Sequence, residues 1–484
     1  MHGEGRRMKI GSLSGTVVAV CLLLVMALAG CFGGAASNAT NETGVAFASP
    51  QAFGVGKAPA GIASADLNAD GIDDLVVANA GSNTVSVLLN TTVAASPSPS
   101  PSASPNRVTT SAQTDASPSP SPAKVVLSDA FDFGAVSEVG SVTTADIDGD
   151  GRPDIVMGGP TGAVGVLLNT TSGGASTPTF SGLFLFQSST LAQQVSVATA
   201  DLNGDGRIDV VATNRGDNSV SVFLNTTITH VAPTFLGPFT FGTGGGPQQV
   251  VIRDVNADGF LDLVTANSNG SVSVLLGSTE KVTAVPQPPA PTFSRVVSVN
   301  VGDGASNALV VDDIDGDGRQ DIAVATGAGN AAILLNTTVT NASPTPTPAA
   351  SATPVAATPS IDVSFASAQL FGLEGTPVSL CDGPFAVGGR YDLAAALSGG
   401  TNVAVLVNRS TVGTASYDSG GLWSAGTNPA FVLALDVDGD GKTDLVVSDR
   451  TTNQISVLMN ISTTPLVSAV SSPTVATSPV TTTR

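Results

Sequence analysis

The chain has 484 residues and a formal net charge of −20, with 38 acidic against 18 basic side chains. A nucleic-acid partner is excluded, because phosphate binding needs clusters of Lys and Arg that this composition does not supply. Only 12% of the residues are charged and 54 are Gly, which excludes long charged helices and favours short strands joined by tight turns. The three cysteines, Cys21, Cys31 and Cys381, are too few for a disulfide framework.

The N-terminal segment has the order of an export signal. Arg6, Arg7 and Lys9 precede an apolar stretch at 17–26, and small residues follow it. Its end, Leu28-Ala29-Gly30-Cys31, resembles a bacterial-type lipobox, which implies cleavage after residue 30 and a lipid on Cys31. Residues 1–30 are therefore predicted as a lipoprotein signal peptide and 31–44 as a flexible tether. The alternative is an uncleaved anchor, because the stretch approaches the roughly 20 residues that span a bilayer.

An acidic phrase recurs along the rest of the chain. Six copies of Asp-x-Asp/Asn-x-Asp-Gly-x-x-Asp begin at residues 66, 146, 201, 254, 313 and 436. A degenerate seventh copy begins at Pro384 and keeps only its closing residue, Asp392. Two low-complexity inserts, at 95–123 and 342–360, lengthen two of the intervals and are predicted to be disordered. Without the inserts the copies recur about every 50 to 55 residues, and regular repeats of this length indicate an array or a propeller.

Each repeat contains four apolar runs of strand length, which we name A to D. In the third repeat they are 195–200, 209–213, 219–224 and 234–241, and the acidic phrase joins A to B. One four-stranded antiparallel sheet per repeat is typical of a propeller blade.

The two ends of the repeat region complement each other. The chain finishes its last repeat after a C run at 454–459, and an unpaired D-like run stands at 45–53. The sequence therefore predicts an all-β fold over residues 45–464, a seven-bladed β-propeller of four-stranded antiparallel blades. The N-terminal strand completes the last blade and closes the ring. Residues 465–484 are predicted to be a disordered Ser/Thr/Pro tail.

The acidic phrase has the spacing of a cation loop. Oxygen donors stand at positions 1, 3, 5 and 9, position 7 is expected to offer its backbone carbonyl, and Gly at position 6 permits a sharp turn. A donor set of oxygens alone favours Ca²⁺ over zinc or copper, whereas metal-free Asx-turns are the alternative. Six loops predict about six calcium ions. The predicted ligands are Asp66, Asn68, Asp70, Ile72, Asp74, Asp146, Asp148, Asp150, Arg152, Asp154, Asp201, Asn203, Asp205, Arg207, Asp209, Asp254, Asn256, Asp258, Phe260, Asp262, Asp313, Asp315, Asp317, Arg319, Asp321, Asp436, Asp438, Asp440, Lys442 and Asp444.

These repeats resemble the FG-GAP/VCBS family, whose relatives include the propeller heads of integrin α-subunits. The resemblance covers roughly residues 45–460 and implies a propeller with cation loops between strands A and B. The copy at Pro384 departs from the pattern at positions 1, 3 and 5, so we expect that blade to be metal-free.

Two further sets of residues are candidates for surface contacts. Asn-x-Ser/Thr sequons recur at the end of run C, as glycan acceptors or as a turn preference of the repeat; their Asn residues are Asn90, Asn169, Asn225, Asn336, Asn408 and Asn460. The B–C connections lie at the end of each blade opposite the cation loops, and short loops on a rigid scaffold often carry binding residues. The predicted ligand-face residues are Asn79, Arg215, Asp217, Asn267 and Arg450.

No His/Cys or Ser/His/Asp constellation is visible, so we do not predict an enzyme. The sequence favours an exported lipoprotein, held to the membrane through its lipid at the cell surface. Its calcium-binding propeller would act as a rigid scaffold for a protein or glycan ligand. The alternatives are a polysaccharide-degrading enzyme on a propeller and an envelope spacer without a specific ligand.

Overall fold

The computed structural model describes residues 44–93, 124–189, 193, 196–229, 231–278, 291–302, 304, 306–339, 362–388 and 390–463. The signal peptide, Cys31, both inserts and the tail lie outside these residues, and so does the tether except for Gly44. Those predictions remain predictions. No helix among the described residues is long and apolar enough to cross a membrane.

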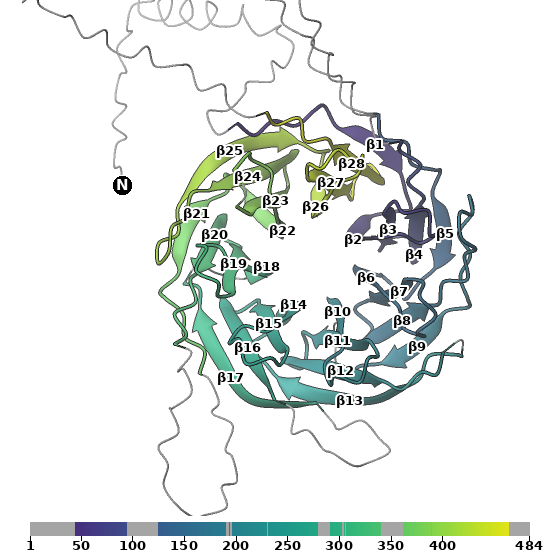
Figure 1. Ribbon diagram of the computed structural model, residues 1–484, viewed down its shortest axis with the longest axis horizontal. Helices are drawn as coiled ribbons and strands as arrows, with labels where there is room; N and C mark the ends of the chain where they lie inside the picture. Colours follow the sequence, from purple (N-terminus) through teal and green to yellow (C-terminus); the bar gives the residue numbers. More distant parts are fainter. Residues whose placement is uncertain are drawn as a thin grey trace, which may run out of the picture. The chain divides into compact units, whose positions relative to one another are not determined.

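Seven sheets of four antiparallel strands form a ring, which confirms the predicted propeller (Figure 1). We number the blades I to VII along the chain and keep the letters A to D for the strands of each blade. Blade I holds β2 (Pro59–Ala65), β3 (Asp74–Asn79), β4 (Thr84–Leu88) and β5 (Phe131–Gly134); blade II, β6 (Ser141–Ala145), β7 (Asp154–Gly158), β8 (Ala163–Leu167) and β9 (Phe184–Gln187); blade III, β10 (Val197–Ala200), β11 (Asp209–Asn214), β12 (Ser219–Asn225) and β13 (Phe235–Gly242); blade IV, β14 (Pro247–Arg253), β15 (Asp262–Asn267), β16 (Ser271–Ser278) and β17 (Thr292–Asn300); blade V, β18 (Ser306–Asp312), β19 (Asp321–Thr326), β20 (Asn330–Leu334) and β21 (Gln369–Gly372); blade VI, β22 (Thr376–Gly383), β23 (Asp392–Ser398), β24 (Asn402–Asn408) and β25 (Tyr417–Ser424); blade VII, β26 (Pro429–Leu435), β27 (Asp444–Asp449), β28 (Gln454–Leu458) and β1 (Gln51–Gly54).

The B and C strands are apolar on both faces because each sheet is covered on both sides by its neighbours. Every residue of β3 is buried, whereas the outer strand β5 alternates between half-buried and exposed positions. The core is correspondingly divided among the interfaces between blades. One cluster joins Val156 and Val166 of blade II to Val210 and Phe223 of blade III. Short, continuous apolar runs are typical of strands buried in this way.

The ring closes through the N-terminal strand, as the sequence predicts. Strand β1 pairs antiparallel with β28, with Gln51 opposite Val457 and Gly54 opposite Gln454. A further bridge joins Phe47 to Asn460. The first described segment therefore belongs to the last blade (Figure 1).

A buried asparagine at the end of strand C joins each of six blades to the blade before it. The Nδ2 of Asn225 donates to the Ile147 carbonyl of blade II at 2.8 Å and to the Ile208 carbonyl of its own blade at 3.0 Å. Its Oδ1 accepts the N–H of Thr227. The same bond to the preceding blade spans 2.8–3.1 Å in blades I, II, III, V, VI and VII, including the contact from Asn90 to Val437 across the ring closure.

These six asparagines are the Asn residues of the sequons. All are at most 4% exposed, and their side-chain amides are engaged by the bonds just described. The third residue of each sequon also has a structural partner: the Thr227 Oγ1 accepts the N–H of Thr234, where strand D approaches. In the folded protein these asparagines are therefore part of the blade interfaces, and a glycan on them is excluded.

Blade IV has Gly277 where the other blades have this asparagine. A Cβ at Gly277 would lie 2.2 Å from the Leu261 carbonyl oxygen, so the backbone has closed over the space that a side chain would need. The interface between blades III and IV thus lacks the asparagine bond.

We expect Asn225→Asp to destabilise the propeller. The substitution keeps the shape but removes the Nδ2 donor and buries a carboxylate against the carbonyls of Ile147 and Ile208. The expected loss is about 3 kcal/mol of unfolding free energy, measurable by denaturant unfolding. Asn300→Asp is the matched control, because Asn300 is exposed and its Oδ1 accepts an N–H that a carboxylate also accepts. Equal losses in the two variants would contradict the role of Asn225.

Candidate metal centres

The A–B connections share one backbone conformation in the six acidic loops. Position 6 is a Gly with φ between 83° and 89° in all six, which only Gly adopts without strain. Position 4 is also left-handed, and in blades I and IV it is Ala69 (φ 54°) and Ala257 (φ 58°). The sequence predicted the need for Gly at position 6 but not the left-handed backbone at position 4.

The Asp at position 1 organises the turn. The Oδ1 of Asp146 accepts the N–H of Gly149 at 2.8 Å, and its Oδ2 accepts the N–H of Gly151 at 2.9 Å. The bond to position 6 recurs in the other five loops at 2.8–2.9 Å. This carboxylate is therefore fixed at the mouth of the loop.

The Asp at position 9 is the first residue of strand B and is buried. In blade II the Oδ2 of Asp154 accepts the N–H of Ile147 at 2.8 Å, and its Oδ1 accepts the N–H of Asn169 at 2.7 Å. One carboxylate thus joins the start of the loop to the end of strand C. Corresponding bonds occur in all seven blades, including blade VI, where Asp392 accepts from Ala386 and Asn408.

Three loops bring the carboxylates of positions 1, 3 and 9 together. In each group one oxygen per residue lies within 4.8 Å of the others. The groups are Asp146, Asp148 and Asp154; Asp313, Asp315 and Asp321; and Asp436, Asp438 and Asp444. Three adjacent carboxylates repel one another, and an all-oxygen set of this kind fits a hard divalent cation. Three clusters in the described residues can therefore hold metal ions.

The other three loops carry Asn at position 3 and have one carboxylate fewer. In blade I the Asn68 Oδ1 accepts the N–H of Asp70, and its Nδ2 donates to the Asp70 carboxylate at 3.0 Å. Asn203 and Asn256 make the same amide-to-carboxylate bond. An amide oxygen remains a calcium ligand, so these loops differ from the first three in charge rather than in donor type.

Position 5 is not part of the three carboxylate groups, because its side chain is engaged elsewhere. In blade II the Asp150 Oδ1 accepts the N–H of Arg152 at 2.9 Å, and its Oδ2 pairs with the Arg152 guanidinium. The guanidinium Nε also donates to the Asn169 carbonyl at 2.9 Å. Arg207, Arg319 and Lys442 form the corresponding ion pairs. The position-7 carbonyls named from the spacing remain a prediction.

Burial raises the pKa of the position-9 carboxyls. Desolvation is the largest cause, neighbouring carboxylates add to it, and the two backbone N–H donors oppose it. The pKa of Asp74 rises to about 6, and the pKa values of Asp154, Asp209, Asp262, Asp321 and Asp444 rise to about 7. Without a cation, these groups exchange protons near neutral pH.

Blade VI departs from the other blades in its loop. Besides Asp392 it offers no carboxylate at the loop positions, and Arg390 stands at position 7. The Arg390 Nη1 reaches the Ile314 carbonyl of blade V at 3.4 Å, and the Gly413 N–H donates to Asp315 at 2.6 Å. Blade VI therefore packs its connections against the loop of blade V.

The predicted ligand-face residues separate into two groups. Asn79 and Asn267 are fully buried; their amides donate to serine hydroxyls of strand C, as from Asn79 to Ser86 at 2.8 Å and from Asn267 to Ser273 at 2.9 Å. They brace the B–C turn and cannot contact a ligand, which corrects the prediction for both. Arg215 and Arg450 are exposed, and Asp217 is half-buried.

A seven-bladed propeller with acidic loops between strands A and B is the class that fold and site define. Residues 146–212 and 201–265 match the model of the FG-GAP-like repeat. Integrin alpha pat-2 of Caenorhabditis elegans is 29% identical over 245 residues, which cover 40% of this chain and 18% of that protein. This chain thus spans about a fifth of that relative's length. Residues 146–265 thus resemble FG-GAP-like repeats, and part of the chain is similar to an integrin α-subunit.

Two similar solved structures are crystal structures of BBS1N in complex with ARL6DN, soaked with mercury and with lead. Their TM-scores are 0.49 and 0.48, each at 9% sequence identity. The alignments cover 86% and 84% of this chain and 96% and 94% of those chains.

We predict that pH affects the stability of the metal-free and the calcium-loaded protein in opposite directions. The folded state holds protons on the position-9 carboxyls up to about pH 7, whereas the unfolded chain releases them near pH 4. In chelator, the melting temperature should therefore rise as the pH falls from 7.5 to 5.5. In millimolar calcium it should fall over the same range, because protons compete with the ion. Parallel changes in the two series, measured by differential scanning calorimetry, would contradict this account.

Proposed function

We propose that this chain is an exported, lipid-anchored propeller that binds about six calcium ions and serves as a rigid scaffold for a protein or glycan ligand at the cell surface. The observation that carries the proposal is the set of carboxylate clusters in the A–B loops. Without a cation these carboxylates repel one another. With a cation each loop becomes a fixed joint between strands A and B.

Six calcium sites are proposed because six loops share the backbone turn and the oxygen donors, although three of them carry Asn at position 3. The carboxylates at positions 1, 3, 5 and 9, the position-3 amides and the position-7 carbonyls would hold the ion. The bound ion would neutralise the cluster and keep position 9 ionised at neutral pH. Blade VI would remain without metal.

We expect metal analysis of the folded protein to give about six calcium ions per chain. Asp146→Asn combined with Asp148→Asn should lower this number to about five and lower the melting temperature. Asp418→Asn, an exposed residue paired with Arg409 on the outer strand of blade VI, is the control and should leave the number unchanged. Seven ions would show that blade VI binds metal, and none would overturn the proposal.

The lipid anchor, if attached at Cys31, would hold the cation-loop end of the propeller nearest to the membrane. The chain enters the propeller at Gly44, and Phe47 pairs with Asn460 beside the loop of blade VII. A tether of 13 residues reaches at most about 45 Å. Four apolar side chains lie exposed on the C–D connections at this end: Val93, Ile228, Val339 and Val412, at 67–86% exposure.

Cys31→Ala should release the protein from the membrane fraction, and retention there would contradict the anchor.

The opposite end, formed by the B–C and D–A connections, would then face outward. Its exposed charged residues include Arg215 and Arg450, on turns that the buried Asn214 amide and the Asp449 carboxylate hold in place. We propose that the ligand binds at this end. A polysaccharide-degrading enzyme is the rival function, and product analysis on any glycan ligand distinguishes it.

We expect Arg215→Ala with Asp217→Ala, or Arg450→Ala, to weaken binding of a ligand found on glycan and protein arrays about tenfold or more. Arg295→Ala is the control, because Arg295 lies exposed on the outer strand β17 in an ion pair with Asp362. Loss of binding in the control with no loss in the loop variants would place the ligand elsewhere. Calcium-independent binding would contradict the scaffold role of the ions.

A further inference from the structure

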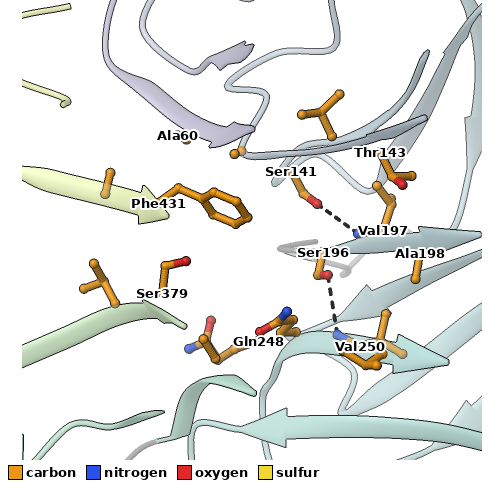
Figure 2. Close-up of a pocket in the computed structure, with 18 of the residues that line it drawn as sticks. Ala60, Ser141, Thr143, Ser196, Val197, Ala198, Gln248, Val250, Ser379 and Phe431 are labelled. Atoms are coloured by element: carbon orange, nitrogen blue, oxygen red, sulfur yellow. Dashed lines mark hydrogen bonds between the residues drawn. The ribbon is translucent and has the colours of Figure 1, made fainter. Parts of the chain in front are cut away.

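A cavity of about 510 Å³ lies in the centre of the ring, among the inner strands (Figure 2). All seven A strands contribute to it, β10 and β14 along most of their length and the others with residues nearer their beginning, and Arg450 of the B–C turn in blade VII also lines it. The cavity therefore lies toward the end of the ring that we propose as the binding face. Its volume is within the roughly 300–1,000 Å³ of small-molecule sites.

The cavity exists because small residues occupy corresponding inward positions of the inner strands. In five blades these are Gly61, Ser141, Ser196, Ala308 and Ser379. Blades IV and VII carry larger residues, Gln249 and Phe431. One aromatic wall thus faces a space surrounded by small polar groups, as Figure 2 shows for Phe431, Ser379, Ser196 and Ser141.

The polar groups of this ring are oriented by the neighbouring blades. The Oγ atoms of Ser141, Ser196 and Ser379 each accept a backbone N–H from the next inner strand, at 3.1, 3.4 and 3.2 Å. Gln249 does the same through Oε1, at 2.8 Å from the Leu309 nitrogen. Each group keeps a donor after making this bond: three hydroxyl hydrogens and the Gln249 Nε2. The cavity therefore offers four hydrogen-bond donors, from blades II, III, IV and VI.

The charge of the cavity is opposite to that of the protein. None of the residues that line the cavity is Asp or Glu, although the chain has 38 acidic residues. Two arginines of the chain, Arg253 and Arg450, do line it. Arg253 also lines a second cavity with Asp312 and Asp382, and Asp382 is close enough to interact with it. Arg450 forms no ion pair within the described part of the chain, so its charge is available to a ligand.

We propose that this cavity binds one hexuronic acid unit, free or at the end of a polysaccharide, with its carboxylate toward Arg450 and its ring against Phe431. The proposal rests on the binding face proposed above and specifies its ligand. A uronic acid supplies a negatively charged partner for Arg450. It also supplies several oxygen acceptors for the donors of Ser141, Ser196, Ser379 and Gln249. Its C–H face suits an aromatic wall. An acidic peptide side chain carries the charge but leaves most of these donors unmatched.

Titration of the calcium-loaded chain with glucuronic, galacturonic and mannuronic acids tests the proposal, with glucose as the neutral probe and a Glu-rich peptide as the acidic peptide probe. At least one uronic acid should bind about tenfold or more tightly than glucose, by calorimetry or ligand-detected NMR. Arg450→Gln should remove this preference. Thr143→Phe should abolish binding, because Thr143 lines the cavity and makes no side-chain hydrogen bond among the described residues.

Thr240→Phe is the matched control, on the exposed outer strand β13, and should bind like the parent protein. A uronic acid that binds equally well to the Thr143→Phe variant would overturn the cavity site. Tighter binding of the Glu-rich peptide than of every uronic acid would overturn the choice of ligand. If arrays yield a ligand that depends on Arg215 and Asp217 but not on Thr143, the binding face stands and the uronic acid site is wrong. If uronic acid binds as expected and the variant at Arg215 and Asp217 binds it as tightly as the parent protein, ligand binding at this face depends on the cavity and not on that loop.

Discussion

The carboxylate at position 9 of each A–B connection is the interaction on which the propeller depends. It accepts one N–H from the beginning of the loop and one from the end of strand C, so two connections of the same blade meet at one buried group. In six blades the residue that supplies the second N–H is also the asparagine that binds the preceding blade. The fold of a blade and its attachment to the ring are thus coupled through a few atoms. A cation bound to the same carboxylate would stabilise both at once.

Blade VI separates the structural role of this Asp from its role as a candidate metal ligand. Asp392 keeps both backbone bonds although its loop has lost the acidic residues at positions 1, 3 and 5. The position-9 Asp is therefore required by the blade itself, whether or not its loop carries the other acidic residues. In three of the remaining blades it also lies beside the carboxylates of positions 1 and 3. Burial is the main reason that the pKa of each position-9 carboxyl lies above its usual range, and the adjacent carboxylates raise it further.

The number of blades, their four strands and the closure of the ring could be predicted, because they depend on periodicity and on the unpaired runs at the two ends. Even the degenerate blade was visible from Asp392 and the strand that follows it. The side-chain partners could not be predicted, because they join residues far apart in the sequence: Asn90 meets Val437 only after the ring has closed. Asn79 and Asn267 stand beside the B–C turns and were therefore expected at the surface. They are buried because their amides donate to serine hydroxyls of strand C, beyond the turn. The regular recurrence of the sequon at one place in every blade but one was the available signal for the asparagine bonds.

Blade IV shows what the asparagine does by replacing it with Gly277. At this position strand β16 pairs Gly277 with Phe293, just as Asn225 pairs with Phe235 and Asn408 with Tyr417 in their blades. The Leu261 carbonyl occupies the space where a side chain would begin, so the same region is filled by backbone instead of an amide. Strand pairing in blade IV is therefore kept, while its asparagine bond to blade III is absent. The asparagine adds attachment between blades without changing the pairing within a blade, and six of the seven interfaces carry this attachment.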